Sequence, residues 1–323
     1  MTGSAPARGA TAETVNGKEA RYMSGSPGDV PVIIEVAING ARTRKDNPHV
    51  PLSSDEIVDS ILACVDAGAS IIHAHAGQPI VGSGGHHDSE VYADAFRCVL
   101  GRHPNLLLYP TLPGGGPGTT MQGRLAHVAK LAELGLVGLV PVDPGTMNFG
   151  RLGREGQPPR NPHVYQTTFE DVAWAFNFCR KHDLACTLSL FEPGFMRLSE
   201  AYRHAGMLPR STIIKLEFCT GDLLFGLSPD EVGLNAWFRL FDADALPWMV
   251  TLRDGNVNDG LTELALRRGG HVRVGIEDYR GPLKRRNEEF VAEAATIARK
   301  VGRRPATPEE TRAHLRIPVR SPD

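Results

Sequence analysis

The feature that most constrains this chain is a regular alternation of short apolar runs with longer amphipathic segments, which begins at Pro31 and continues almost to the C-terminus. Each run is mostly apolar or β-branched, as expected of a strand that is buried on both faces. The segments between the runs are long enough for helical crossovers, so the strands should form a parallel sheet. The predicted strands cover residues 32–38, 70–76, 105–110, 137–142, 185–190, 212–218, 247–252 and 272–276.

The segments between the strands carry helix signals. Ser53 to Glu56 offer a cap and an acidic first turn, and apolar side chains then recur at helical spacing until Gly68. Further helices are expected at residues 88–100, 120–134, 168–182, 198–205, 230–241, 260–268 and 283–301.

The number of units favours one fold class. Eight strand–helix units fit a single-domain α/β fold, the closed (β/α)8 or TIM barrel, which usually takes about 250 residues. A doubly wound open sheet is the alternative. No GxGxxG motif follows the first strand, where the sequence reads Asn39-Gly40-Ala41-Arg42, and this weighs against the open sheet.

The start of the chain has a different composition. Residues 1–30 are rich in small and polar residues and lack the apolar run of about 7 to 15 residues that a secretory signal needs. No stretch approaches the roughly 18 apolar residues of a membrane span. We therefore expect residues 1–30 to form a flexible N-terminal tail, residues 31–323 to form the catalytic barrel, and the protein not to enter a membrane.

Charge and cysteine content narrow the partners and the compartment. With 35 Lys and Arg against 37 Asp and Glu, the formal net charge of −2 offers no basic surface for nucleic acid or an anionic membrane. A small molecule is therefore the expected partner. The five cysteines are odd in number and form no CxxC pair, which favours a reducing, cytoplasmic compartment and a place for these thiols in the core.

The second predicted strand ends in a His-x-His pair. In a barrel, functional groups lie at the C-terminal ends of the strands, and strand alternation puts His73 and His75 on one face, about 6 to 7 Å apart. Two histidines at this spacing can share a metal ion, although a histidine at a strand end also serves as an ordinary hydrogen-bonded polar residue.

The last predicted strand supplies a candidate for the third ligand. Alternation places Arg273, Gly275 and Glu277 on one face, with Glu277 at the mouth of the barrel. Two imidazoles and one carboxylate leave coordination positions open for a substrate, and this ligand set favours Zn²⁺ over Fe²⁺ or Mn²⁺. A simple ion pair between Glu277 and Arg273 is the alternative.

Taken together, these residues resemble the β-keto acid cleavage enzyme family. The HxH motif after Ala-Gly-Ala and the distant RxGxED motif are specific in this combination and order, whereas either alone would be weak. The resemblance covers nearly the whole chain after the tail. It is carried by residues 39–41, 46–48, 67–75, 114–115, 145–149, 269–278 and 306–310.

The resemblance implies an activity and a set of site residues. It implies a zinc-dependent (β/α)8 barrel that condenses a β-keto acid with acetyl-CoA and then cleaves the product, releasing acetoacetate and a new acyl-CoA. His73, His75 and Glu277 match the zinc ligands, with one zinc in each chain. Asp278, paired with Arg273, matches the general base that takes a proton from the acetyl group. The family also suggests a homo-oligomer, such as a tetramer.

Several loop residues are candidates for substrate binding. Thr111 and the amides around Gly114 and Gly115 are placed to bind the substrate carboxylate, although a glycine loop after a strand can also be a plain tight turn. Glu192, after the fifth predicted strand, could contact the substrate, orient a histidine or lie in solvent.

The chain departs from the family pattern in the first strand–helix loop. Where the prototype has a glutamate that receives the substrate's ammonium group, this sequence has Arg42. A cation there would repel a cationic tail and attract an anionic or hydrogen-bonding one. Arg44 could take the place of Arg42, and a solvated surface arginine is the remaining alternative.

Two other classes of function remain open from the sequence. An amidohydrolase-type hydrolase is also a barrel with an HxH strand, but it usually carries that motif on the first strand and adds histidines on later ones. The second alternative is a non-catalytic barrel that binds a metal and a CoA or keto-acid ligand. In such a protein, a base beside an open metal site would have no role.

Overall fold

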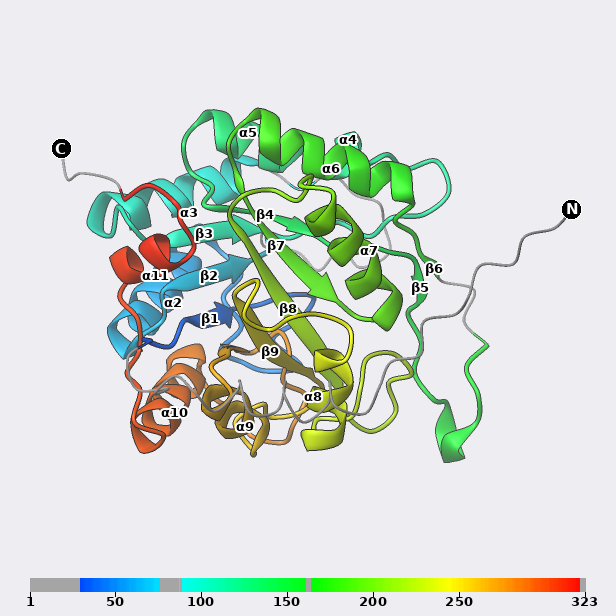
Figure 1. The fold of residues 1–323 in the computed structure, drawn as a ribbon. Coiled ribbons are helices and arrows are strands. Elements are labelled where there is room, and N and C mark those ends of the chain that lie inside the picture. Colours follow the sequence, from blue (N-terminus) through cyan, green and yellow to red (C-terminus); the bar gives the residue numbers. More distant parts are fainter. Residues whose placement is uncertain (1–29, 76–86, 88, 161–163, 320–323) are drawn as a thin grey trace, which may run out of the picture.

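The computed structural model describes residues 30–75, 87, 89–160 and 164–319. Apart from Val30, the predicted tail lies outside the described residues. The described part is a (β/α)8 barrel, as the sequence predicts, with the helices packed around the strands (Figure 1). Among the described residues, no helix combines the length and apolar character needed to span a membrane.

Eight parallel strands form the barrel. Their order in the sheet is β3-β2-β1-β10-β9-β8-β7-β4, and every neighbouring pair is parallel. The ring closes between β3 and β4, where the N–H of Gly138 donates to the carbonyl of Leu108 at 2.7 Å. The strands are β1 (Ile34–Ala37), β2 (Ile71–Ala74), β3 (Leu107–Pro110), β4 (Leu139–Val142), β7 (Ala185–Leu190), β8 (Thr212–Cys219), β9 (Trp248–Arg253) and β10 (His271–Val274).

The helices cover the outside of the barrel. The first of them shows why the sequence signals work, because Ser53 and Glu56 form a capping box and Gly68 ends the helix in the left-handed conformation. The helices are α2 (Ser54–Ala67), α3 (Ser89–Arg102), α4 (Met121–Arg124), α5 (Ala126–Glu133), α6 (Phe169–Lys181), α7 (Pro193–His204), α8 (Glu231–Phe238), α9 (Leu261–Arg267), α10 (Asn287–Lys300) and α11 (Pro308–His314).

All eight predicted strands are present, but some helix boundaries differ from the prediction and some short elements were not predicted. Helix α7 begins five residues earlier than predicted, because Glu192 is extended and Pro193 fits the first helical position. The helix predicted at 120–134 divides into α4 and α5 at Leu125. A short antiparallel pair, β5 (Met147–Asn148) with β6 (Val164–Tyr165), and helix α11 were not predicted, since such short elements show no clear periodicity.

The interior of the barrel has an apolar floor and a polar layer above it. The floor is a cluster of buried side chains that includes Ile33, Ile71, Leu107, Ile213 and Met249. Because strand side chains alternate, the residue two positions further along each strand also points inward. Those residues are Glu35, His73, Tyr109, Lys215 and Thr251, and all are buried. The same alternation that makes the floor apolar thus builds a polar layer toward the C-terminal end.

The cysteines follow the prediction with one exception. All five are free, and Cys64, Cys179, Cys186 and Cys219 are buried. Cys98 is exposed on α3, so its expected place in the core was wrong. Helical periodicity alone did not show that it lies on the outer face.

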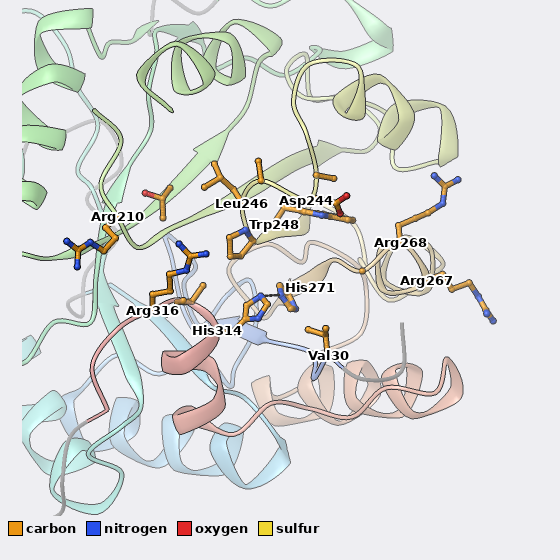
Figure 2. Close-up of a pocket in the computed structure, with 16 residues that line it drawn as sticks. Val30, Arg210, Asp244, Leu246, Trp248, Arg267, Arg268, His271, His314 and Arg316 are labelled. Atoms are coloured by element: carbon orange, nitrogen blue, oxygen red, sulfur yellow. Dashed lines mark hydrogen bonds between the residues drawn. The ribbon is translucent and has the colours of Figure 1, made fainter. Parts of the chain in front are cut away.

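The N-terminal end of the barrel holds a cavity of about 530 Å³ (Figure 2). Its lining includes the first residues of three strands, Thr212, Trp248 and His271, so it lies at the end opposite the predicted site. His271 Nδ1 accepts the N–H of Ile33 at 3.0 Å, and its Nε2 lies 3.4 Å from Nε2 of His314. One hydrogen must lie between these two ring nitrogens, which suits neutral rings.

Burial of His271 leads to a prediction about acid stability. Burial lowers the pKa of His271 well below its ordinary value, so the unfolded chain takes up a proton below about pH 6.5 while the folded chain does not. The free energy of unfolding should therefore fall as the pH drops below that value. His271→Asn should flatten this dependence by up to about 1.4 kcal/mol per pH unit, measured by urea unfolding between about pH 7 and pH 5. The exposed His182→Asn is the matched control, and equal flattening in both variants would contradict the prediction.

Candidate active site

The two histidines of the HxH motif lie together at the end of β2. Their ring centroids are 5.1 Å apart, and His73 stacks on Tyr109 of the neighbouring strand. Asn39 fixes the backbone of His75 from both sides: its side-chain oxygen accepts the N–H at 2.8 Å, and its amide donates to the carbonyl at 3.0 Å. The Asn39-Gly40 motif after β1 therefore has a direct structural role beside the histidines.

Glu277 reaches both histidines from the loop after β10. Its Oε2 lies 3.2 Å from Nε2 of His73 and 3.6 Å from Nε2 of His75. Gly40 makes this approach possible, because a Cβ there would lie 2.2 Å from Cγ of Glu277. At Gly275, with φ of +131°, a Cβ would lie 2.3 Å from the carbonyl oxygen of Ala37. Both glycines let the backbones pack closely enough to bring the carboxylate to the imidazoles.

These three side chains fit a divalent metal ion. Among the described residues, His73, His75 and Glu277 form a group that could hold a metal ion, because one donor atom from each lies within 4.8 Å of the other two. In a tetrahedral zinc site, neighbouring ligand atoms are about 3.3 Å apart, close to the spacings observed here. His75 Nε2 and Glu277 Oε2 are buried without a hydrogen-bond partner, which is costly unless another group completes them.

The protonation states also suit a metal. Burial lowers the pKa of His73 and lowers that of His75 to about 3, so both rings are neutral near pH 7 and offer lone pairs. Burial, the largest single influence, would raise the pKa of Glu277, but the charge of Arg273 together with the contacts of His73 and His75 outweighs it and holds the pKa well below its usual range. The site therefore presents two neutral imidazoles and one carboxylate.

Asp278 lies beside this group and is firmly held. Arg273 donates to both of its oxygens, at 2.8 and 3.1 Å, and Arg253 donates at 2.6 Å. Thr251 adds a hydroxyl hydrogen bond at 3.0 Å. Burial opposes the charge of Asp278, but Arg253 and Arg273 outweigh it and lower the pKa. The predicted pairing of Asp278 with Arg273 is present in the structure.

Arg273 connects the site to the polar layer beneath it. Besides Asp278 it contacts Glu277 at 3.0 Å and Glu35 at 3.2 Å, so the ion pair considered as an alternative exists alongside the ligand cluster. Tyr109 and Lys215 complete the layer around Glu35. One buried guanidinium thus orients two carboxylates and is itself positioned from below.

Arg253 was not predicted to belong to this network. Its guanidinium contacts Glu217 at 2.9 Å as well as Glu277 at 3.3 Å. Its position as the last residue of β9 was the available signal, because strand ends face the site.

Close packing explains the presence of one of the two candidate glycines in the loop after β3. A Cβ on Gly115 would lie 1.8 Å from the carbonyl oxygen of Gln166, which favours the close-packing explanation for that residue. Gly114 has more room, since its nearest neighbour would be an atom of Tyr165 at 4.0 Å. Thr111 is buried, and its carbonyl bonds to His127 Nε2 at 2.9 Å. The predicted carboxylate-binding role of Thr111, Gly114 and Gly115 stays a prediction.

Glu192 and the two loop arginines have distinct surroundings. Glu192 precedes α7, is half-buried, and has a pKa raised by that burial. Arg42 is only 8% exposed, which excludes a solvated surface arginine, and its Nε donates to the main-chain oxygen of Glu277 at 3.0 Å. Arg44 instead pairs with Glu56 at the start of α2 and is half exposed. Of the two arginines, Arg42 is therefore the one beside the ligand cluster.

The comparison with known proteins agrees with this geometry. Residues 31–317 match the profile described as beta-keto acid cleavage enzyme. The chain belongs to the β-keto acid cleavage enzyme family. This assignment removes the support for the amidohydrolase alternative. The described strand ends of this chain also add no histidine to the ligand group, whereas an amidohydrolase usually has further histidine ligands.

Two relatives align with this chain over nearly their whole length. The chain is 26% identical to the 3-keto-5-aminohexanoate cleavage enzyme of Fusobacterium nucleatum over 299 residues, covering 88% of this chain and 98% of that protein. It is 26% identical to the 3-oxoadipate:acetyl-CoA acetyltransferase of Cupriavidus necator over 303 residues, covering 89% and 95%. The binary complex of ObcA with oxaloacetate shares the fold, with a TM-score of 0.62, 16% identity and coverage of 84% of this chain and 68% of that chain.

Proposed function

We propose that this protein transfers an acyl group between a β-keto acid and acetyl-CoA, giving acetoacetate and a new acyl-CoA, with one zinc ion in each chain. The observation that carries the proposal is the group of His73, His75 and Glu277 beside the carboxylate of Asp278, in a chain of this family. The cysteine content supports a cytoplasmic enzyme, and the family supports a homo-oligomer. Fe²⁺ or Mn²⁺ would fit the same ligands less well.

His73, His75 and Glu277 would hold the metal. A divalent ion bound there would polarise the ketone of the β-keto acid and stabilise negative charge that develops on its oxygen. The buried cluster around these residues carries four carboxylates, Glu35, Glu217, Glu277 and Asp278, against three cations, Lys215, Arg253 and Arg273. Its formal charge of −1 supports a bound dication, and the resulting +1 would attract the substrate's own carboxylate.

Asp278 would act as the general base. It would accept a proton from C2 of the β-keto acid, and that carbon would then attack the thioester carbonyl of acetyl-CoA and displace CoA thiolate. The thiolate would add to the ketone carbon C3, and cleavage of the C2–C3 bond with return of the proton to C2 would release acetoacetate and the new acyl-CoA. The acetyl methyl carbon, to which the family resemblance pointed, cannot be the nucleophile, because its attack on the ketone would give acetate and a β-ketoacyl-CoA. Arg273, Arg253 and Thr251 fix the carboxylate and keep it ionised, which orients the base but reduces its basicity. Asp278 is also only 4% exposed, so little water would reach its carboxylate.

Substrate binding would use the loops at the same end of the barrel. Thr111, Gly114 and Gly115 would bind the carboxylate of the β-keto acid, and Glu192 would contact the substrate from the loop after β7. Arg42, buried beside Glu277, would face the substrate tail and make a cationic tail unfavourable.

A substrate panel tests the proposed reaction. The zinc-loaded enzyme should convert β-keto acids and acetyl-CoA into acetoacetate and acyl-CoA in equal amounts, with cationic-tail substrates turned over most slowly. Both products should be quantified by mass spectrometry. Absence of acetoacetate with every substrate would contradict the proposal, and hydrolysis of an ester or lactam instead would favour a hydrolase.

A further inference from the structure

Three arginines from three different loops surround one carboxylate beside the ligand cluster. Asp254 follows β9, and its Oδ1 lies 3.6 Å from Nη2 of Arg42 and 3.5 Å from Nε of Arg280. Arg151, from the segment after β5, pairs with the other oxygen of Asp254. We call Arg42, Arg151, Arg280 and Asp254 the arginine cluster.

The position of Asp254 is fixed by the backbone. Its φ is +66°, a left-handed conformation that aspartate tolerates better than most residues. Its N–H donates to the main-chain oxygen of Asp278 at 2.7 Å. The arginine cluster is therefore attached directly to the loop that carries Glu277 and Asp278.

The cluster holds more positive charge than it neutralises. Three guanidinium groups against one carboxylate give a formal charge of +2, and no other carboxylate of the described residues lies within ion-pair distance of these arginines. Such an arrangement is completed by an anion.

The location identifies which anion. Arg42 is 8% exposed and its Nε already donates to the main-chain oxygen of Glu277, so the cluster begins next to the proposed metal ligand. A β-keto acid bound at that metal would direct its tail toward the neighbouring loops. The phosphates of CoA are a second source of negative charge, but they lie at the far end of a long flexible arm and do not require a buried arginine beside the metal.

We infer that the arginine cluster binds a second carboxylate at the end of the substrate tail, so that the substrate is a β-keto dicarboxylic acid. This inference rests on the proposed function and specifies its substrate class. Arg151 and Arg280, which the sequence did not indicate, would share the recognition of the tail with Arg42. Asp254 would hold the three guanidinium groups in place before the substrate arrives.

The first test compares two substrates that differ only in the tail end. 3-Oxoadipate and 3-oxohexanoate have the same six-carbon chain, but only the first ends in a carboxylate. Wild-type kcat/KM should be at least about tenfold higher for 3-oxoadipate, which corresponds to about 1.4 kcal/mol. Arg151→Gln and Arg280→Gln should each reduce this ratio about tenfold, whereas Arg267→Gln, which removes a similarly exposed arginine from α9, should not.

The remaining measurements separate the possible failures. A ratio near one in the wild type, or unchanged in both variants, would overturn the inference while leaving the proposed reaction intact. If Arg280→Gln instead weakened only the preference for acetyl-CoA over its 3′-dephospho form, the cluster would serve CoA and the inference would be wrong. If no β-keto acid reacts, the proposed function fails, and calorimetry still tests the cluster: adipate should bind more tightly than hexanoate, and equal binding would overturn it.

Discussion

Replacing His73 with alanine should remove the bound metal and nearly all activity. The variant keeps only two of the three ligands, and a metal held by one imidazole and one carboxylate exchanges readily with solvent. Loss of the charge that stabilises the developing oxyanion should cost about 4 kcal/mol or more, a thousandfold loss in kcat/KM. Metal content should be measured by mass spectrometry of the protein after gel filtration, with activity assayed in parallel.

Two further variants make this result specific. Glu277→Gln keeps the size of the side chain but removes its charge, so zinc should fall from about one per chain to a small fraction. His127→Ala removes a buried histidine that bonds to a backbone carbonyl and lies outside the ligand group, so its metal content should match the wild type. Full zinc retention in both His73→Ala and Glu277→Gln would reject the ligand assignment.

The strands were predictable because their signal is strong and local. The strand Ala185–Leu190 is buried on both faces and carries only apolar and small hydroxyl side chains, and its predicted and observed bounds are identical. The start of α7 was missed because the apolar spacing begins late, after Glu192, Pro193 and Gly194. The antiparallel pair of β5 and β6 was missed because two-residue strands have no measurable period.

The ligand group was predictable because alternation fixes side-chain direction. His73, His75 and Glu277 could be placed on inward faces at the mouth from strand position alone, and they meet as expected. The motif Asn39-Gly40 entered only through family resemblance. The structure gives its physical reason, since Asn39 clamps the backbone of His75 and Gly40 makes room for Glu277.

The charge network could not be predicted in the same way. Arg151 and Arg280 lie outside the named helices and strands, and Arg253 ends β9, where the strand pattern does not show which partners its side chain meets. The partners of these three arginines are up to 103 positions away in the sequence. Guanidinium groups have long flexible stems, so the sequence position does not determine where the charge goes. Only the fold shows that Arg253 pairs with Glu217, Glu277 and Asp278 and that Arg151 and Arg280 surround Asp254.

Asp278→Asn should separate the chemical step from metal binding. The amide cannot accept a proton from C2 of the β-keto acid, so kcat should fall by about 10²- to 10⁴-fold while zinc stays bound. Enzyme-catalysed exchange of the C2 hydrogens of the β-keto acid with deuterated water, measured by mass spectrometry above the uncatalysed rate, should fall by a similar factor. The variant should also lose stability, because Arg273 and Arg253 would remain buried with one negative charge fewer.

Thr251→Val provides the matched control for this experiment. It removes one hydrogen bond to Asp278 but leaves the carboxylate and both arginine contacts in place. With one donor fewer, the pKa of Asp278 should rise and its basicity increase, so hydrogen exchange should persist at a tenth of the wild-type rate or better. If Asp278→Asn, correctly folded and zinc-loaded, exchanged the C2 hydrogens of the β-keto acid as fast as Thr251→Val, another group would have to be the base. The close packing of Asp278 against two arginines would then be explained by charge balance around Glu277 alone.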